Sequence, residues 1–237
     1  MEKKGVVEAN TRFYNLIACG YEKADGRRKR QEWLEKLINS LSIGHSTFLD
    51  IGAGTGYIST IAAKHFHTVI ASDVSSEMLS RVPMLPNIKI KIDPAERLSQ
   101  LSESIDVACT FATLHHIEKL TPVFREIHRV LRPRGIYYSD HDIEKHFVTK
   151  NRIPLQIYRA IKNKKRSFAR ISPEAGKLYD SVEHHKDGLD SDLLRITLTA
   201  IGFKVYIFYH WQGILPIKGD SFRKGYAPMM RIIAIKQ

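Results

Sequence analysis

The sequence predicts an α/β protein whose strands form one open, twisted, mostly parallel sheet with helices on both faces. Short apolar runs alternate with helical patterns over the first 140 residues, as in βαβ units joined by right-handed crossovers. A turn with three glycines directly follows the first apolar run and precedes a helical pattern, a junction typical of ligand-binding α/β folds. The 237 residues suffice for one large domain, and 43% apolar and 26% charged residues are ordinary for a globular protein.

The individual elements follow from the spacing of apolar residues. Five runs are predicted as strands: Thr47–Ile51, His67–Asp73, Ile88–Ile92, Ile105–Thr110 and Gly135–Ser139. Four helical patterns lie between them: Gly56–Phe66, Ser76–Arg81, Ala95–Leu101 and Thr121–Leu131. Before the first strand, residues 27–41 place their apolar side chains on one helical face, which predicts a helical lead-in.

After the fifth strand the alternation stops for about fifty residues, which predicts an insertion. The stretch Lys145–Arg170 holds nine Lys or Arg and no acid, and so carries most of the net charge of +12. A helix over Ser191–Ala200 and strands over Phe203–Trp211 and Met229–Lys236 follow, and the short loop between these strands makes them antiparallel. We expect one domain over 1–237, divided into a lead-in (1–44), a core (45–140), a basic insertion or lid (141–188) and a C-terminal helix and strand pair (189–237).

The glycine-rich turn limits the ligand that the fold can bind. A dinucleotide fingerprint would need Gly or Ala where Tyr57 stands, and no Lys or Arg for a phosphate occurs from Ser46 to Ala63. Asp50 ends the first strand and suits a positively charged ligand. Asp73 ends the second strand, where an acid can bind both hydroxyls of a ribose, or can simply cap the next helix. A nucleoside with a cationic group, S-adenosylmethionine, fits this combination, and a glycine-rich loop without a ligand is the alternative.

Four motifs in order resemble the class I S-adenosylmethionine-dependent methyltransferases, in particular the small-molecule branch that includes the quinone-biosynthesis enzymes. The motifs are Phe48–Gly56, Val69–Asp73, Ser104–Ala108 with Thr113–Ile117, and Phe124–Pro133. The resemblance covers about Phe48 to Asp140 and implies a Rossmann-like fold with S-adenosyl-L-methionine as cofactor. It is not specific for a substrate.

The resemblance also implies a set of cofactor-binding residues. They are Asp50, Gly52, Ala53, Gly54, Gly56, Asp73, Val74, Met78, Asp93, Pro94 and Phe111. One departure concerns the adenine site, where the family often has Asp immediately before Ala-Glu. Here Pro94 precedes Ala95-Glu96, so that Asp93 or the carbonyl of Pro94 would have to replace the usual acid.

Candidate catalytic residues follow the fourth and fifth strands, because the pocket of an open α/β sheet lies beyond their carboxyl ends. We expect His116 and His141 to act there, with Asp140 or Asp142 orienting His141. The alternative is that these are polar loop residues. Many possible metal ligands are present: His115, His116, Asp140, His141, Asp142 and His146. No metal site is predicted, because adjacent loop residues seldom ligate the same ion.

The basic insertion has three interpretations. Leu155, Tyr158 and Ile161 have helical spacing and predict a helix packed on an apolar surface, either as a lid over the pocket or as a peripheral contact with a membrane. The segment Glu183–His185 can cap the same pocket. The third interpretation is a surface for nucleic acid, for which weak, non-specific binding at low salt is expected.

The sequence therefore predicts a methyltransferase acting on an O, N or C nucleophile of a small-molecule acceptor, with acidic, carrier-bound and lipidic acceptors all open. The alternatives are an RNA-modifying methyltransferase that uses residues 145–170 and a non-catalytic cofactor-binding module. The run Thr110–Leu114 lacks the Asn/Asp-Pro-Pro-Tyr pattern of base amino methyltransferases. Two distant cysteines, Cys19 and Cys109, and no apolar run of membrane-spanning length favour a cytoplasmic protein.

Overall fold

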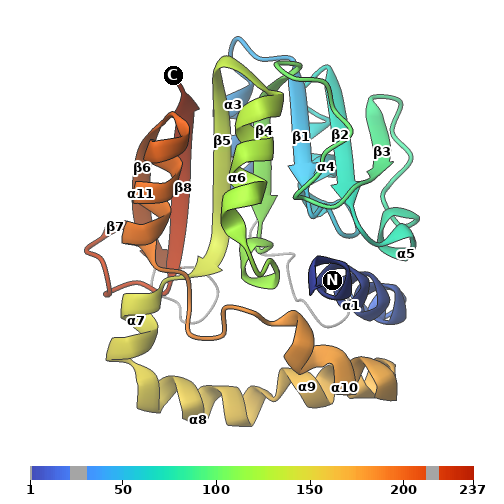
Figure 1. The fold of residues 1–237 in the computed structure, drawn as a ribbon, viewed down its shortest axis with the longest axis vertical. Coiled ribbons are helices and arrows are strands. Elements are labelled where there is room, and N and C mark those ends of the chain that lie inside the picture. Colours follow the sequence, from blue (N-terminus) through green and yellow to red (C-terminus); the bar gives the residue numbers. More distant parts are fainter. Residues whose placement is uncertain (1, 22–30, 212–218) are drawn as a thin grey trace.

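The computed structural model describes residues 2–21, 31–211 and 219–237, which form an eight-stranded sheet in the order β3-β2-β1-β4-β5-β8-β6-β7 (Figure 1). The strands are β1 (Thr47–Ile51), β2 (Thr68–Asp73), β3 (Ile88–Ile92), β4 (Ile105–Phe111), β5 (Leu131–Ile143), β6 (Phe203–Trp211), β7 (Gly219–Phe222) and β8 (Met229–Lys236). The first five are parallel to one another, whereas β8 is antiparallel to both β5 and β6. The predicted fold class is confirmed.

Of the first five predicted strands, β1 and β3 have the predicted bounds, β2 begins and β4 ends one residue later than predicted, and β5 is longer. β5 begins at Leu131 and continues to Ile143, so that residues 140–142 lie in the strand and not in a loop after it. Its pairing with β8 shifts register between Ser139 and Asp142, and His141 has a φ of 68°. This bulge bends the end of the strand. The sequence did not predict β7, which pairs antiparallel with β6.

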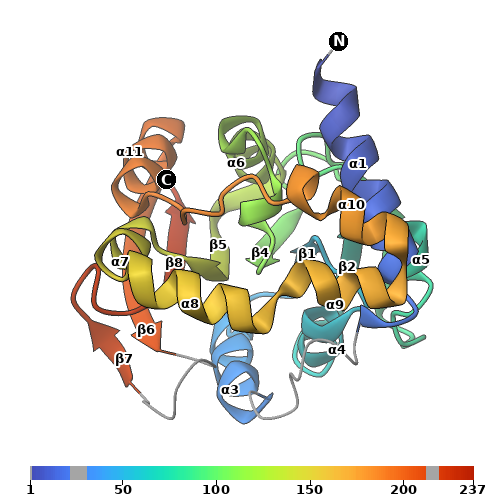
Figure 2. The ribbon, with the colours of Figure 1, turned by 90° about the horizontal axis from the view of Figure 1, so that it is seen from below.

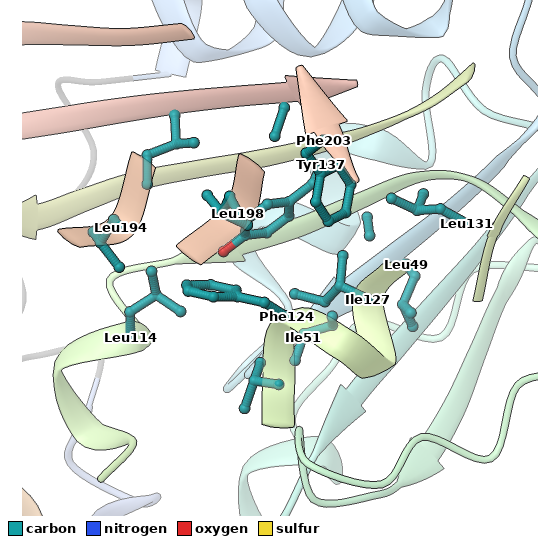
Figure 3. Packing of buried hydrophobic residues seen from close by; sticks show 14 of the residues in the cluster. Leu49, Ile51, Leu114, Phe124, Ile127, Leu131, Tyr137, Leu194, Leu198 and Phe203 are labelled. Atoms are coloured by element: carbon teal, nitrogen blue, oxygen red, sulfur yellow. The ribbon is translucent and has the colours of Figure 1, made fainter. Parts of the chain in front are cut away.

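Helices cover both faces of the sheet (Figure 1). α3 (Gln31–Ser42) and α4 (Tyr57–Ala62) lie on one face, and α6 (Leu120–Val130) and α11 (Ser191–Ile201) lie on the other. Because side chains alternate along a strand, Phe48 packs with the α3–α4 side and Leu49 with the α6–α11 side. Figure 3 shows the apolar cluster on the α6–α11 side of the sheet. Its members include Leu49, Phe124, Ile127, Tyr137, Leu194, Leu198 and Phe203. Burial on both faces explains the nearly continuous apolar runs.

Other helices lie beyond the carboxyl ends of the parallel strands (Figures 1 and 2). They are α1 (Glu2–Ile17), α5 (Ser76–Leu79), α7 (Lys145–Lys150), α8 (Arg152–Lys162), α9 (Lys164–Ile171) and α10 (Pro173–Val182). The insertion packs on the N-terminal helix through Phe13 and Phe168, whose ring centroids are 5.3 Å apart. Part of the predicted lead-in helix, residues 27–30, lies outside the described residues. No helix in the described ranges is long and apolar enough to cross a membrane.

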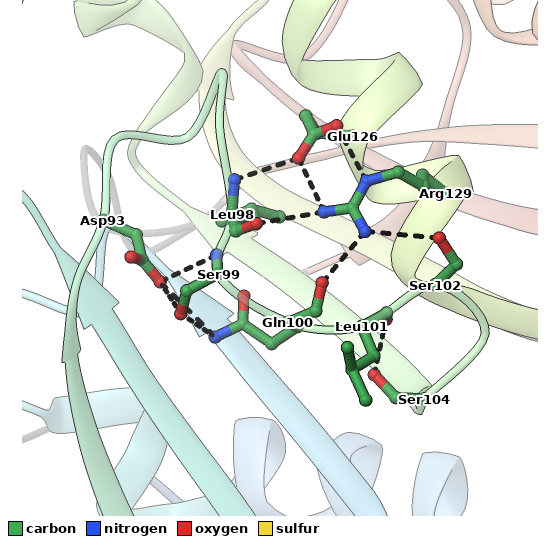
Figure 4. A network of polar contacts seen from close by, with 9 residues as sticks. All are labelled: Asp93, Leu98, Ser99, Gln100, Leu101, Ser102, Ser104, Glu126 and Arg129. Carbon is green, nitrogen blue, oxygen red and sulfur yellow. Dashed lines mark hydrogen bonds and ion pairs between the residues drawn. The ribbon is translucent and has the colours of Figure 1, made fainter.

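The helix predicted over Ala95–Leu101 is wrong, because side chains bind the backbone groups that a helix would pair (Figure 4). Glu126 Oε2 accepts a hydrogen bond from the Leu98 amide at 2.9 Å, and Arg129 Nη2 donates to the Leu98 carbonyl at 3.0 Å. Asp93 Oδ2 accepts from the Ser99 hydroxyl at 2.7 Å. The segment is therefore a loop held by α6. The helices α4 and α5 are also shorter than predicted, ending at Ala62 and Leu79.

The predicted apolar stripe of the insertion helix is packed on the protein only at its first residue. Of the stripe Leu155, Tyr158 and Ile161, only Leu155 is buried, against Phe147 and Val148 of α7. Tyr158 is 39% exposed and Ile161 is 76% exposed. A helical spacing identifies residues that share a face, but it cannot distinguish a face that packs on the protein from one that does not.

Candidate active site

The main pocket lies at the carboxyl ends of β1 and β4, where the chain order of the sheet changes direction. From β1 the chain continues through β2 and β3 on one side, and from β4 it continues through β5 on the other. The pocket, together with the solvent space at its mouth, measures about 950 Å³. Its walls come from the turn after β1, the ends of β2 and β3, the loop after β4, and α1.

The turn after β1 requires its three glycines. Gly52, Gly54 and Gly56 have φ values of 73°, 55° and 81°, a region that side chains disfavour. A Cβ at Gly52 would lie 2.4 Å from Thr113 Cγ2, and one at Gly56 would lie 2.8 Å from Val82 Cγ1. A Cβ at Gly54 would meet nothing within 4 Å. Gly54 therefore leaves its backbone accessible to a ligand, whereas Gly56 is needed for the turn and does not line the pocket.

Asp73 fixes this turn from the neighbouring strand. Its Oδ2 accepts a hydrogen bond from the Gly54 amide at 2.8 Å, and its Oδ1 accepts from the Ser75 amide at 2.9 Å. Burial raises the pKa of Asp73 above its ordinary value. The N-cap of α5 is Ser75, whose hydroxyl oxygen accepts from the Met78 amide. The alternative of Asp73 as a simple helix cap is therefore wrong.

The pocket wall is acidic. Asp50, Asp73, Asp93 and Glu96 line it, and no Lys or Arg is among the described lining residues. Asp50 is 1% exposed, and its Oδ2 accepts from the Ser59 hydroxyl at 2.7 Å. These carboxylates fit a ligand with positive charge, such as a sulfonium or an ammonium group, and oppose a pyrophosphate.

Most of the predicted cofactor residues line this pocket. Those that do are Asp50, Gly52, Ala53, Gly54, Asp73, Val74, Met78, Asp93 and Phe111. Gly56 and Pro94 do not, and Ala95 and Glu96 stand in the wall beside Asp93 instead. Sequence reasoning missed Val6, Val7, Asn10, Tyr14, Tyr21, Thr55, Tyr57, Ile58, Ala112, Thr113 and Ile117. Those next to the glycine turn or to His116 could have been found from the motifs, but nothing in the sequence of α1 marks it as a pocket wall.

His116 lines the pocket together with Tyr14 of α1. Its Nδ1 lies 2.9 Å from the Val182 carbonyl, which can only accept, so that Nδ1 carries the proton. Its Nε2 then accepts a hydrogen bond from the Tyr14 hydroxyl at 2.6 Å. Burial, and the neighbouring His115, hold the pKa of His116 well below its ordinary value. The ring is therefore neutral at pH 7, with Nε2 able to accept a proton.

Asp142, one of the two carboxylates considered in the sequence as a partner of His141, contacts His115 instead. Its Nδ1 lies 2.7 Å from Asp142 Oδ1, which also accepts from the His115 amide. One ligand atom each of His115, His116 and Glu183 lies within 4.8 Å of the others, which is a spacing that could hold a metal ion. Both ring nitrogens of His116 are already hydrogen-bonded, so that an ion there would have to displace the Tyr14 hydroxyl. The backbone amides of His184 and His185 donate to the His115 carbonyl, which brings this segment against the same loop.

His141 is buried behind the pocket. Its ring stacks on Phe111 with centroids 4.1 Å apart, and it is not among the residues that line the pocket. Its Nδ1 lies 3.0 Å from Asp140 Oδ1, as the sequence suggested. Asp140 also accepts from the Tyr138 hydroxyl, His210 Nε2 and Arg231 Nε. Although burial opposes its charge, His141 and His210 hold the pKa of Asp140 well below its ordinary value.

Comparisons with known proteins agree with this geometry. Residues 49–139 match the family model described as a methyltransferase domain. A protein of Methanocaldococcus jannaschii called uncharacterized protein MJ1252 is 31% identical over 57% of this chain and 51% of its own length. The malonyl-[acyl-carrier protein] O-methyltransferase of Methylococcus capsulatus is 30% identical over 52% of this chain and 47% of its own length. The chain thus spans about half the length of these two relatives.

A solved structure extends the likeness to the whole fold. The putative S-adenosylmethionine-dependent methyltransferase of Listeria monocytogenes superposes with a TM-score of 0.61 at 15% identity, over 89% of this chain and all of the other. The matched residues 49–139 contain the glycine turn, Asp73 and His116. The sheet order, the pocket and the match of residues 49–139 to a methyltransferase-domain model agree with a class I S-adenosylmethionine-dependent methyltransferase fold. The family match itself covers residues 49–139 of the 237 residues.

Proposed function

We propose that the chain transfers a methyl group from S-adenosylmethionine to a hydroxyl or amino group of a small-molecule acceptor bound against α1 and His116. The observation that carries this proposal is the hydrogen bond of 2.6 Å between Tyr14 and His116 in the same pocket as the glycine turn and Asp73. A pair that can accept a proton next to a cofactor site is what the methylation of a protonated nucleophile needs.

Three features of the chain fit the cofactor. Asp73 lies in the pocket wall, which supports a contact with the ribose hydroxyls. The backbone of Gly54 is accessible to a ligand, and Asp50 suits the cationic amino-acid end. When bound, S-adenosylmethionine supplies an electrophilic methyl group. The residues of the pocket hold that group near the acceptor and exclude water, which alone contributes much of the rate.

The proton leaves through Tyr14 and His116. An acceptor hydroxyl or neutral amine donates a hydrogen bond to the Tyr14 oxygen, whose own proton points to His116 Nε2. When the lone pair of the acceptor atom takes the methyl carbon, the carbon–sulfur bond of the cofactor would break and leave a neutral thioether. The acceptor's proton would pass to Tyr14, and the proton of Tyr14 to His116. The Val182 carbonyl keeps the proton on Nδ1 and stabilises the imidazolium that results.

The wall at this end of the pocket favours an apolar, uncharged acceptor. Val6, Val7, Tyr21 and Ile117 supply apolar and aromatic surface around the Tyr14–His116 pair. Among the described lining residues no Lys or Arg is available for a carboxylate or a phosphate. An aromatic or lipidic alcohol or amine is therefore better supported than an acidic acceptor. The name of the Methylococcus relative says that it methylates a carrier-bound malonyl group. The carboxylate of such an acceptor would find no Lys or Arg among the described residues of this wall.

RNA modification has one observation in its favour, the exposed basic side chains of α8 and α9. A panel of methyl acceptors with methyl-labelled S-adenosylmethionine separates the two functions. Phenols, aliphatic alcohols and amines should be methylated, and transfer RNA should not. Methylation of transfer RNA alone would favour the alternative, and methylation of no acceptor together with intact cofactor binding would favour a non-catalytic module.

The proton path is tested with Tyr14→Phe. We expect methyl transfer to fall at least about tenfold while the dissociation constant for S-adenosylhomocysteine stays within about twofold, because only the hydroxyl is lost. Tyr206→Phe is the matched control, since this tyrosine lies on β6 and is 40% exposed. Equal rates for Tyr14→Phe and the wild type would remove Tyr14 from the mechanism.

A further inference from the structure

The helix α8 is almost unsupported by the rest of the protein. Of its eleven residues, Arg152–Lys162, only Leu155 is buried. An isolated helix of this length is marginal in water, and most helices in proteins are stabilised by packing of an apolar face. In α8 the packing on the protein is limited to Leu155 against α7. The other apolar residues of the helix therefore need a separate explanation.

That apolar face is on the solvent side. Ile153, Ile157 and Ile161 are spaced by four residues and so lie along one face of α8. They are 70%, 58% and 76% exposed. Leu155 lies on the other side of the helix, toward α7. Three aligned, exposed isoleucines form an apolar stripe of the kind that marks an interaction site.

The surroundings of the isoleucine stripe are strongly basic. The segment Lys145–Arg170 has nine basic residues and no acid. Lys145 and Lys165 form ion pairs with acids outside the segment, Asp190 and Asp180. The remaining side chains with positive charge and no ion pair to a described residue include Arg152, Lys162, Lys164, Arg166 and Arg170, all exposed. The stripe is therefore flanked by charges that are available to an anionic partner.

Two kinds of partner do not fit the isoleucine stripe and its basic surroundings. A second copy of the chain packed through a twofold axis would place the same basic helix against itself, and like charges would repel. A nucleic acid would neutralise the basic side chains, but it would leave the isoleucines in water, since phosphates and riboses do not cover an aliphatic stripe. The occupant must be apolar and anionic at the same time.

We propose that α8 binds the surface of an anionic phospholipid bilayer. The helix lies in the plane of the interface, with Ile153, Ile157 and Ile161 among the acyl chains and the basic side chains of α8 and α9 at the headgroup phosphates. α8 and α9 lie in one outer layer beyond the carboxyl ends of the strands, on the same side of the sheet as α1 (Figure 2). This inference does not rest on the proposed function, because it concerns a surface outside the pocket.

Co-sedimentation with vesicles tests the proposal. The wild-type protein should bind vesicles of equal parts phosphatidylglycerol and phosphatidylcholine and should bind pure phosphatidylcholine far more weakly. The triple variant Ile153→Gln, Ile157→Gln, Ile161→Gln should bind the anionic vesicles at least about 10²-fold more weakly, because the apolar area is lost. Replacing Lys162, Lys164 and Arg166 by Gln should cost roughly fivefold per charge on anionic vesicles.

The control variant is Leu193→Gln with Ile196→Gln, which changes two apolar residues on α11, outside the basic segment, that are 61% and 66% exposed. It should bind vesicles like the wild type. Calorimetry with S-adenosylhomocysteine and circular dichroism show that every variant is folded. No binding of the folded wild type to anionic vesicles, or equal binding by the isoleucine variant, would overturn the proposal. A wild-type dimer that the isoleucine variant disperses would also overturn it, because it would make a second copy the occupant.

Discussion

Two histidines near the carboxyl ends of adjacent strands have partners of different kinds. His116 follows β4 and is hydrogen-bonded to two neutral groups, the Tyr14 hydroxyl and the Val182 carbonyl. His141 lies in β5 and contacts a buried carboxylate, Asp140, that also binds His210 and Arg231. The first stands in the pocket wall, whereas the second is behind Phe111. The comparison teaches that a histidine beside a carboxylate is not for that reason catalytic, since several donors on one buried carboxylate describe a structural network.

The largest effect is expected for the carboxylate of that network. Asp140→Asn removes the charge that pairs with Arg231 and accepts hydrogen bonds from His141 and His210, so that a buried ion pair is broken. We expect the free energy of unfolding to fall by about 3–5 kcal/mol in a urea titration. Asp190→Asn, which breaks an exposed pair with Lys145, should change it by less than about 1 kcal/mol. Equal effects of the two variants would mean that the Asp140 network does not stabilise the fold.

Changing each of the two histidines to glutamine should affect different properties, the rate for His116 and the stability for His141. His116→Gln should lower methyl transfer about 10²-fold, or ~2.7 kcal/mol, because the proton acceptor is lost while Tyr14 remains. His141→Gln should lower the urea midpoint, with the rate per folded molecule kept within about fivefold of the wild type, since its ring does not reach the pocket. Initial rates at a temperature where both variants are folded check this difference. A greater loss of rate in His141→Gln would reverse the assignment.

Asp73→Ala sharpens the contrast between a structural and a binding carboxylate. It should weaken binding of S-adenosylhomocysteine by ~1.5–3 kcal/mol, because charge-assisted hydrogen bonds to the ribose and to the Gly54 amide are both lost. Titration calorimetry measures this, with exposed Glu77 on α5 changed to Gln as the control. NAD should bind more weakly than S-adenosylhomocysteine to the wild type, because the wall has no cation for a pyrophosphate. An unchanged dissociation constant in a folded Asp73→Ala protein would show that Asp73 only supports the turn.

The smallest effect is a dependence of stability on pH. The pKa of His116 in the folded protein is well below its ordinary value of 6.5, so below pH 6.5 the unfolded chain binds a proton that the folded chain does not. The free energy of unfolding should therefore fall as the pH decreases from 6.5, by at most about 1.4 kcal/mol per pH unit for this group. His116→Gln should remove the contribution of His116 to this pH dependence. The contributions of His128 and His184, whose pKa values burial also lowers, should remain. An identical pH slope in variant and wild type would contradict the neutral state of His116.

The sequence predicted the sheet well because the signals there are local. Strand β1 is an apolar run bounded by a glycine turn, and its bounds were found to the residue. The loop after β3 was wrongly predicted as a helix because its conformation depends on Arg129 and Glu126, which lie about thirty residues away in the sequence. The sequence also could not predict which side of α8 faces solvent. The spacing of apolar residues shows which of them share a helix face, but it does not show what that face contacts.

The wall of the pocket formed by the glycine turn and Asp73 could be predicted for the same reason, because Gly52, Gly54 and Asp73 lie at or just after strand ends within short motifs. The wall formed by α1 and His116 could not. Tyr14 is about a hundred residues from His116 in sequence, and Val182 is more than sixty away. Only the packing of α1 against α10 and α5 brings these groups together, and no pattern in one sequence encodes that packing.

The position of α1 has a consequence for how such a protein can diversify. The family match begins at residue 49, whereas Val6, Val7, Asn10 and Tyr14 of α1 stand in the wall of the pocket. In the proposed function, substitutions in this helix change which acceptor is admitted and leave the glycine turn and Asp73 intact. Selection for a new acceptor can therefore act on a short N-terminal segment, and descendants that share the turn and Asp73 can differ widely in what they methylate.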